Sequence, residues 1–230
     1  MRANVRLVVD LILFFLFPLV FWELSREMIG DYPAMLFSAL PGLIYSLYRF
    51  KERRLNFTSL FMFINLIAGF LLDLLSGSAI QLLWNNIFYS AALFLIYAGS
   101  LAAGKPLHMY FALDMMELNG HDRKLTKELF FEKKVYRLCQ LITALCCLNE
   151  MIYMAMMTKW IQRYGVETYR LDLVFDKSID IVLSGISLIL FLLIRRKAEE
   201  ALPVSRIAKL NGNTLYVWEL SYLFFCNVGL

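Results

Sequence analysis

The sequence predicts an all-α membrane protein with six transmembrane helices, interfacial helices in the 104–137 loop, and a C-terminal amphipathic or re-entrant helix. Apolar residues make up 60% of the 230 residues, and the mean hydropathy is +0.61. A soluble domain is about 45–50% apolar. The apolar residues are concentrated in runs of roughly 16–21, the length of a helix that crosses about 30 Å of hydrocarbon.

These runs form one polytopic transmembrane domain over residues 1–197. A segment alone in lipid can satisfy its backbone hydrogen bonds only as a helix, so each run is predicted to be helical. The first run carries Asp10 and Pro18 and lacks a small-residue cleavage site, so we expect it to be retained rather than removed as a signal peptide. The six predicted spans are 5–24, 33–48, 57–75, 87–103, 138–157 and 174–194.

The distribution of Lys and Arg predicts the orientation of these spans. If the N-terminus lies inside, 18 of the 23 Lys and Arg residues fall in inner segments and 5 in outer segments. We therefore expect a cytoplasmic N-terminus and, from the six crossings, a cytoplasmic C-terminus. The net charge of +4 is then a topology signal, and no basic soluble face for nucleic acid is present.

The long inner loop, 104–137, is predicted to contain two interfacial helices separated by a turn at 119–122. Before the turn, apolar residues alternate with Asp114 and Glu117, and after it Asp122 is a suitable cap for a helix with a cationic face. These helices would lie on the inner leaflet. A solvated loop is the alternative interpretation.

The C-terminal tail, 198–230, is predicted to be cytoplasmic or interfacial. Residues 214–230 are apolar except for Glu219, Ser221 and Asn227. Seventeen such residues form a marginal span. We expect an amphipathic or re-entrant helix, and a seventh crossing is the alternative.

Acidic residues inside the apolar runs are the main candidates for a functional site, because charged groups in hydrocarbon are costly. Asp73, Glu150 and Asp180 lie in the third, fifth and sixth spans, and the only Lys or Arg within those runs is Lys177. Helical periodicity places each acid on a polar stripe that faces other helices. The candidate polar pathway or binding residues are Asp73, Glu150, Asp180, Asn65 and Asn149.

Two interpretations of these acids are open. If the stripes converge, the acids line a pocket open to the outer side and bind a proton, a cation or a basic solute. Alternatively they are structural: Asp73 caps its helix, Asp180 pairs with Lys177, and Glu150 is held protonated by Asn65 or Asn149.

Motifs for enzymatic chemistry are missing from the sequence. It contains no Gly-rich phosphate loop, no H-E-x-x-H and no C-x-x-C motif. The four cysteines have no metal-site spacing, and both histidines, His108 and His121, lie in the 104–137 loop. We therefore predict that the chain is not an enzyme and has neither a cofactor nor a metal site.

Several short motifs lie in the first half of the chain. They are Gly30-x-x-Pro33-Ala34, Ala39-x-Pro41, the basic residues from Arg49, Ser76-Gly77-Ser78, Gly99-Ser100-Leu101 and Gly104-Lys105-Pro106-Leu107. Together they resemble a family of uncharacterised bacterial membrane proteins distantly related to intracellular septation protein A. The resemblance covers about residues 13–107 and implies a bacterial inner-membrane protein linked to envelope maintenance or division. It transfers no catalytic residue.

Two functions are expected from these observations. The first is a non-enzymatic envelope or cell-division-related membrane protein, whose partners are the lipid bilayer and other membrane proteins or further copies of itself. The second is a small secondary transporter or a substrate-binding membrane subunit. In that case Asp73, Glu150 and Asp180 would bind a cation or a small-molecule ligand.

Overall fold

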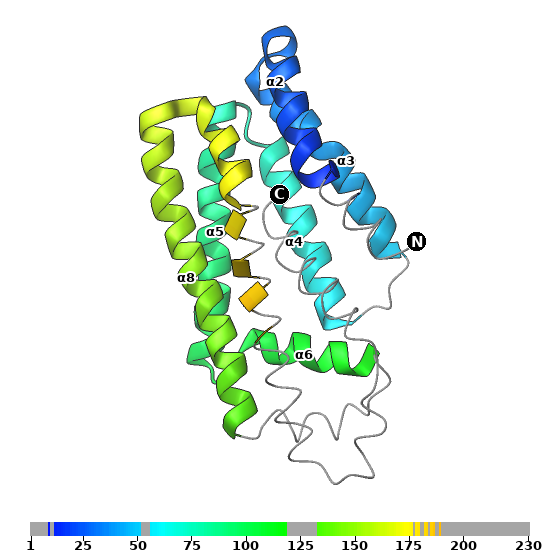
Figure 1. Ribbon diagram of the computed structural model, residues 1–230, viewed down its shortest axis with the longest axis vertical. Coiled ribbons are helices and arrows are strands. Elements are labelled where there is room, and N and C mark those ends of the chain that lie inside the picture. The colour runs from blue at the N-terminus through cyan, green and yellow to red at the C-terminus, as the bar shows by residue number, and fades with distance from the viewer. Residues whose placement is uncertain are drawn as a thin grey trace.

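The computed structural model describes residues 9, 12–51, 56–118, 133–176, 178–179, 182–183, 185–186 and 189 (Figure 1). The described residues are helical or lie in short connections, and none is in a strand. This confirms the all-α prediction. Asp10, Asp180, the 119–122 turn and the 198–230 tail lie outside the described residues, as does most of the sixth predicted span.

The first two spans form a helical hairpin. A π-helical turn, η1 (Ile12–Leu16), continues into α2 (Phe17–Ile29), which packs along α3 (Asp31–Lys51). Gly30 joins them with a φ of +89°, a conformation that side-chain-bearing residues rarely adopt, so α2 ends there. Asp31 starts α3 with a negative charge at the positive end of the helix dipole.

The third and fourth spans are confirmed as helices α4 (Phe57–Leu74) and α5 (Ala79–Ala102). Asn56 caps α4 in a reciprocal box: its side chain accepts from the Ser59 amide at 2.8 Å, and Ser59 Oγ accepts from the Asn56 amide at 3.0 Å. Ser78 caps α5. The fourth helix therefore begins eight residues before the predicted start at position 87.

The helix α6 (Leu107–Leu118) crosses the lower end of the bundle in Figure 1. Its residues coincide with the first of the two helices predicted in the 104–137 loop, and its interfacial position stays a prediction. The helix α8 (Lys133–Tyr164) extends beyond both ends of the fifth predicted span, 138–157, and includes the end of the 104–137 loop. After η2 (Gly165–Glu167) the chain reverses into helical residues 168–176.

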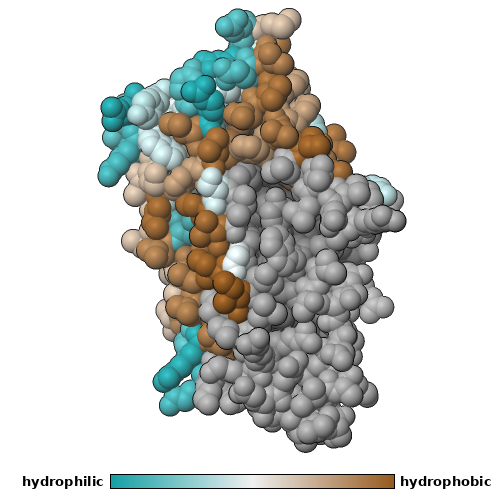
Figure 2. All heavy atoms as spheres, in the orientation of Figure 1, coloured by the Kyte–Doolittle hydropathy of each residue, from teal (hydrophilic) through white to brown (hydrophobic). Residues whose placement is uncertain are grey.

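Three helical stretches among the described residues are long and apolar enough to cross a membrane, whereas six were predicted. They are Phe57–Leu74, Ala79–Ala102 and Val135–Asp176. The helix α2 has only 13 residues, and α3 is less apolar because Tyr, Ser, Pro and Gly interrupt its hydrophobic residues. In Figure 2 an apolar band lies between hydrophilic groups at the upper and lower ends, as on a membrane-crossing surface.

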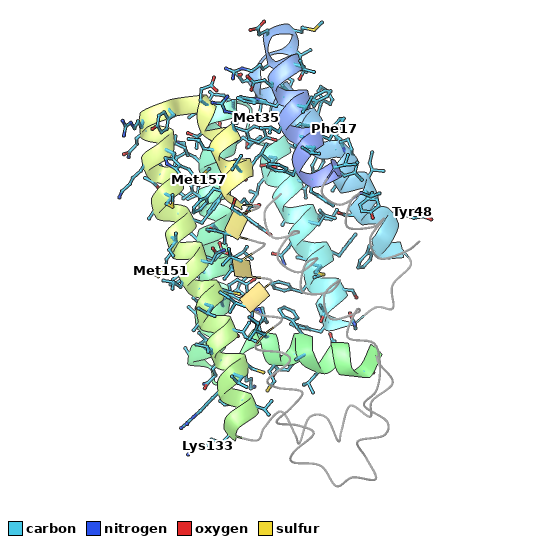
Figure 3. All side chains as sticks on the ribbon, viewed as in Figure 1. Phe17, Met35, Tyr48, Lys133, Met151 and Met157 are labelled. Atoms are coloured by element: carbon cyan, nitrogen blue, oxygen red, sulfur yellow. The ribbon has the colours of Figure 1, made fainter. Side chains whose placement is uncertain are left out.

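The predicted polar stripes face the interior. Asn65, Gly69 and Asp73 on α4 are all buried, and so are Thr143 and Glu150 on α8. The opposite face of α8 carries apolar side chains exposed to the surroundings, and Met151, labelled in Figure 3, is 51% exposed. The pattern is that of helices whose polar groups avoid lipid.

Candidate functional site

The acidic stripes converge on an internal cavity of about 100 Å³. One side of the cavity is lined by the hairpin of η1, α2 and α3. The other side is lined by α5, α8 and residues 168–176, and Asp73 at the end of α4 completes the lining. A buried water needs roughly 10–15 Å³ of such space. The cavity can therefore hold several waters or a small solute.

Four carboxylates line this cavity. They are Asp73 from α4, Glu150 from α8, and Asp172 and Asp176 from the helical residues that follow η2. Among the described residues, no Lys, Arg or His lines the cavity. Buried charges are normally paired, because removing a charge from water is costly. A cavity lined by four acids is suited to a cationic occupant.

The Asp73 side chain is 6% exposed, and its Oδ1 atom has no hydrogen-bond partner among the described residues. The backbone carbonyl of Asp73 is satisfied instead, because it accepts from the Tyr32 hydroxyl at 3.0 Å and from the Ser76 amide at 3.2 Å. These bonds fix the end of α4 against α3. Because the backbone carbonyl is satisfied by these bonds, the carboxylate is the group of Asp73 that faces the cavity.

Glu150 is 6% exposed and accepts a short hydrogen bond from Ser90 Oγ on α5. The prediction that Asn65 or Asn149 would hold Glu150 is therefore wrong. Asn65 instead bonds within α4 and to α5: its Nδ2 donates to the Phe61 carbonyl, and its Oδ1 accepts from the Tyr89 hydroxyl at 2.7 Å.

Some of the candidate residues that the sequence predicted lie together at the cavity. The cavity brings together Asp73, Glu150 and Asn149, and Asn65 lies one contact behind it through Tyr89. Asp180 is outside the described residues, and the acids contributed by that part of the chain are Asp172 and Asp176. Neither Asp172 nor Asp176 was a candidate. The sequence signal for Asp176 is its position one helical turn before Asp180, and Asp172 lies one further turn before it.

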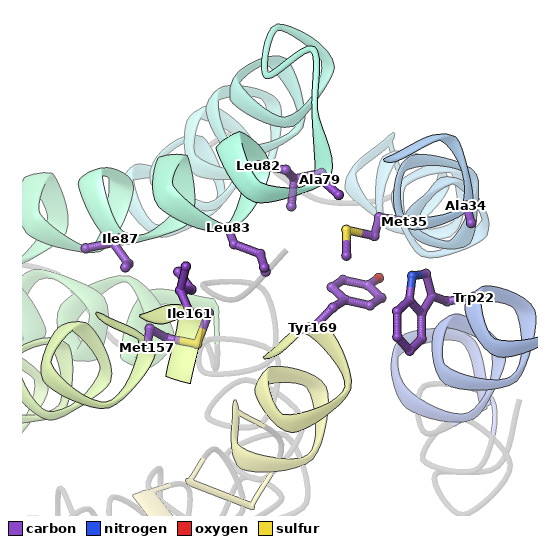
Figure 4. Packing of buried hydrophobic residues seen from close by; sticks show 10 residues of the cluster. All are labelled: Trp22, Ala34, Met35, Ala79, Leu82, Leu83, Ile87, Met157, Ile161 and Tyr169. Carbon is purple, nitrogen blue, oxygen red and sulfur yellow. The ribbon is translucent and has the colours of Figure 1, made fainter. Parts of the chain in front are cut away.

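Aromatic side chains connect the α2–α3 hairpin to residues 168–176. Trp22 is fully buried and meets Tyr169 edge-on with ring centroids 5.4 Å apart, beside Met35 (Figure 4). The Tyr169 hydroxyl forms a 2.8 Å hydrogen bond with Ser38 Oγ on α3. These contacts join the α2–α3 hairpin to residues 168–176 across the cavity.

An ion-pair cluster lies next to the Trp22 ring. Arg26 Nη2 is 2.6 Å from Glu167 Oε1, its Nε is 3.2 Å from Asp31 Oδ1, and its guanidinium lies 4.3 Å from the centre of the Trp22 ring. The hydrogen bond to Glu167 raises the pKa of Arg26 further above its ordinary value. Both acids are well exposed, so the cluster contributes about 0–1 kcal/mol of stability per pair.

A buried histidine lies below the cavity. Thr143 Oγ1 donates to the Cys139 carbonyl at 2.9 Å, so it can only accept from His108 Nδ1, which is 3.1 Å away. His108 Nε2 then faces Cys146 Sγ at 3.5 Å as an acceptor. Burial lowers the pKa of His108 to about 3, so the ring is neutral. Its loop position in the sequence gave no indication of this burial.

The described residues contain no group of three or more His, Cys, Asp or Glu side chains that could hold a metal ion. The cysteines Cys139 and Cys146 are buried thiols. The chemistry that the cavity offers is therefore electrostatic: carboxylate oxygens, tyrosine rings and amide groups around a small space.

Comparison with known proteins gave no match to a protein-family model, a curated protein or a solved structure. The resemblance to septation protein A and its relatives thus stays a prediction from short motifs. In the part of the chain that the structure describes, the protein is all-α, with three candidate membrane-crossing helices and an acid-lined cavity between them and a helical hairpin.

Proposed function

We propose that this chain is a membrane protein, crossing the bilayer six times, that binds a small cation or a protonated solute in the acid-lined cavity. The observation that carries the proposal is the convergence of Asp73, Glu150, Asp172 and Asp176 on one space that no described basic residue lines. Acids scattered over separate helix faces would have favoured a purely structural role. Binding of this kind suits a small secondary transporter or a substrate-binding membrane subunit.

The proposed orientation places both termini in the cytoplasm of a bacterial cell. The connections at Gly30, 75–78 and 165–167 all lie at the upper end of the bundle, and α6 lies at the lower end (Figure 1). Under the positive-inside rule the upper end would face outward, since most Lys and Arg belong to segments expected at the other end. A periplasm-only reporter fused after Glu167 should be active, and one fused after Lys197 should be inactive.

The envelope or cell-division role depends on the sequence resemblance alone. The cation-binding function is preferred because the acid-lined cavity supports it.

Cation-dependent stability of the detergent-solubilised protein tests the proposal. Sodium or 1,4-diaminobutane, compared at matched chloride with the bulky tetrapropylammonium ion, should raise the melting temperature. A ligand at a hundred times its dissociation constant stabilises by about 2.7 kcal/mol. Asp73→Asn and Glu150→Gln should lose most of this gain, whereas the matched control Glu27→Gln, at an exposed acid on α2, should keep it. If no cation stabilises the wild-type protein, the proposal is wrong.

A further inference from the structure

The cavity is small. Its volume is about 100 Å³, and its lining residues on α5 extend from Leu82 to Tyr97. A space of this volume fits a small molecule.

The four acids come from three different helical segments. Asp73 lies at the end of α4, Glu150 lies within α8, and Asp172 and Asp176 are one turn apart on the helical residues after η2. Within the described parts of the chain, no three of them approach closely enough to hold a metal ion. Calcium needs six to eight oxygens at about 2.3–2.6 Å. Separate carboxylates instead suit a ligand with separate positive charges.

Aromatic and aliphatic side chains form the wall between the acids. The rings of Tyr89, Tyr97, Tyr153 and Tyr169 all line the cavity. Two of them are held in place through their hydroxyls, Tyr89 by Asn65 at 2.7 Å and Tyr169 by Ser38 at 2.8 Å. Ring faces attract ammonium groups, and apolar walls favour methylene groups.

Asp73 supplies an independent indication of an amine. Its side chain is 94% buried, and Oδ1 has no hydrogen-bond partner among the described residues, although Asp73 lines the cavity. An orphaned carboxylate oxygen is costly, and an N–H donor that carries a positive charge compensates it best. A sodium ion satisfies the charge but brings no N–H donor and no apolar body.

We propose that the ligand is a short linear aliphatic diamine, with one ammonium group bound near Asp73 and the other near Glu150, Asp172 or Asp176. This inference rests on the proposed cation-binding function. The ammonium groups contact carboxylates, and the methylene chain between them lies against the tyrosine rings.

Binding of radiolabelled 1,4-diaminobutane to the full-length detergent-solubilised protein tests the inference. The competitors are linear diamines of increasing length, butylamine, n-butanol, sodium and magnesium. One optimal diamine should compete about tenfold or more better than butylamine, because the second ammonium group gains a charge-assisted hydrogen bond. Neutral n-butanol should not compete. This series needs only the wild-type protein, so it does not depend on how any variant folds.

Variants then locate the site. Asp73→Asn and Asp176→Asn should each weaken diamine binding about tenfold or more, and Glu27→Gln should leave it unchanged. If sodium or magnesium binds but the diamine does not, or if butylamine competes as well as every diamine, the inference is wrong and the cation-binding function stands. If none of these cations binds, both are wrong.

Discussion

Replacing Asp114 should weaken the attachment of α6 to the first turn of α4. Asp114 on α6 is 1% exposed, and its Oδ2 atom accepts from the Thr58 amide at 2.7 Å and from Thr58 Oγ1 at 2.9 Å. Thr58 lies in the first turn of α4, where backbone amides have no partner within the helix. Asp114 therefore both caps α4 and anchors α6 to it.

The magnitude follows from these two bonds. A hydrogen bond to a charged group contributes about 1.5–3 kcal/mol, so Asp114→Ala should lower the free energy of unfolding by about 3–5 kcal/mol, after partial relaxation of the site. Asp114→Asn keeps an acceptor oxygen without the charge and should cost about 1–2 kcal/mol. Glu117→Ala, at an exposed position on the same helix, should change stability by about 0.5 kcal/mol or less.

Thermal unfolding in a mild detergent, with amide hydrogen exchange of the first turn of α4 as a local readout, measures this order. Exchange in that turn should rise most in Asp114→Ala. Equal stability of Asp114→Ala and Glu117→Ala, with unchanged exchange at Thr58, would refute the assignment of Asp114 as the anchor.

Two further predictions concern packing and pH. Gly42 lines the cavity, and a Cβ there would lie 2.9 Å from Phe14 Cε1, so Gly42→Ala should destabilise by about 1–3 kcal/mol in a melting assay. Gly99→Ala, with no described atom within 4 Å of the added Cβ, should be neutral or stabilising, and equal losses for both would contradict the packing described. Because burial lowers the pKa of His108 from 6.5 to about 3, the unfolded chain binds the extra proton first as pH falls. The contribution of neutral His108 to the free energy of unfolding is complete above about pH 6.5 and falls by about 1.4 kcal/mol per pH unit towards pH 3. The free energy of unfolding of His108→Gln should therefore decrease less steeply with falling pH than that of the wild type.

Hydropathy predicted α4 well because its apolar residues are continuous and lie between clear polar boundaries. It missed the first two turns of α5, where Gln81, Trp84 and Asn85 interrupt the apolar run. Asn85 is used inside the protein, donating to Ser76 Oγ at 2.8 Å and to the Leu72 carbonyl at 3.3 Å. A hydropathy window cannot distinguish a helix turn that faces protein from one that leaves the membrane.

The sequence predicted which helix faces carry the candidate site residues. Periodicity turned Asp73 and Glu150 inward, as the structure confirms. Their neighbours were not predictable, because Ser90 and Glu150 are 60 residues apart and belong to different helices. The burial of His108 was missed for the same reason: it depends on how α6 packs against α8, which no local pattern in α6 specifies.

Difference infrared spectroscopy of the cavity carboxyl groups tests the central claim most directly. Addition of sodium or 1,4-diaminobutane to the reconstituted protein should change absorption in the carboxyl region. The change should shrink in Asp73→Asn and in Glu150→Gln and persist in Glu27→Gln. A spectrum without any cation-induced carboxyl change, or one that is identical in all three variants, would contradict the account of an acid-lined cation site.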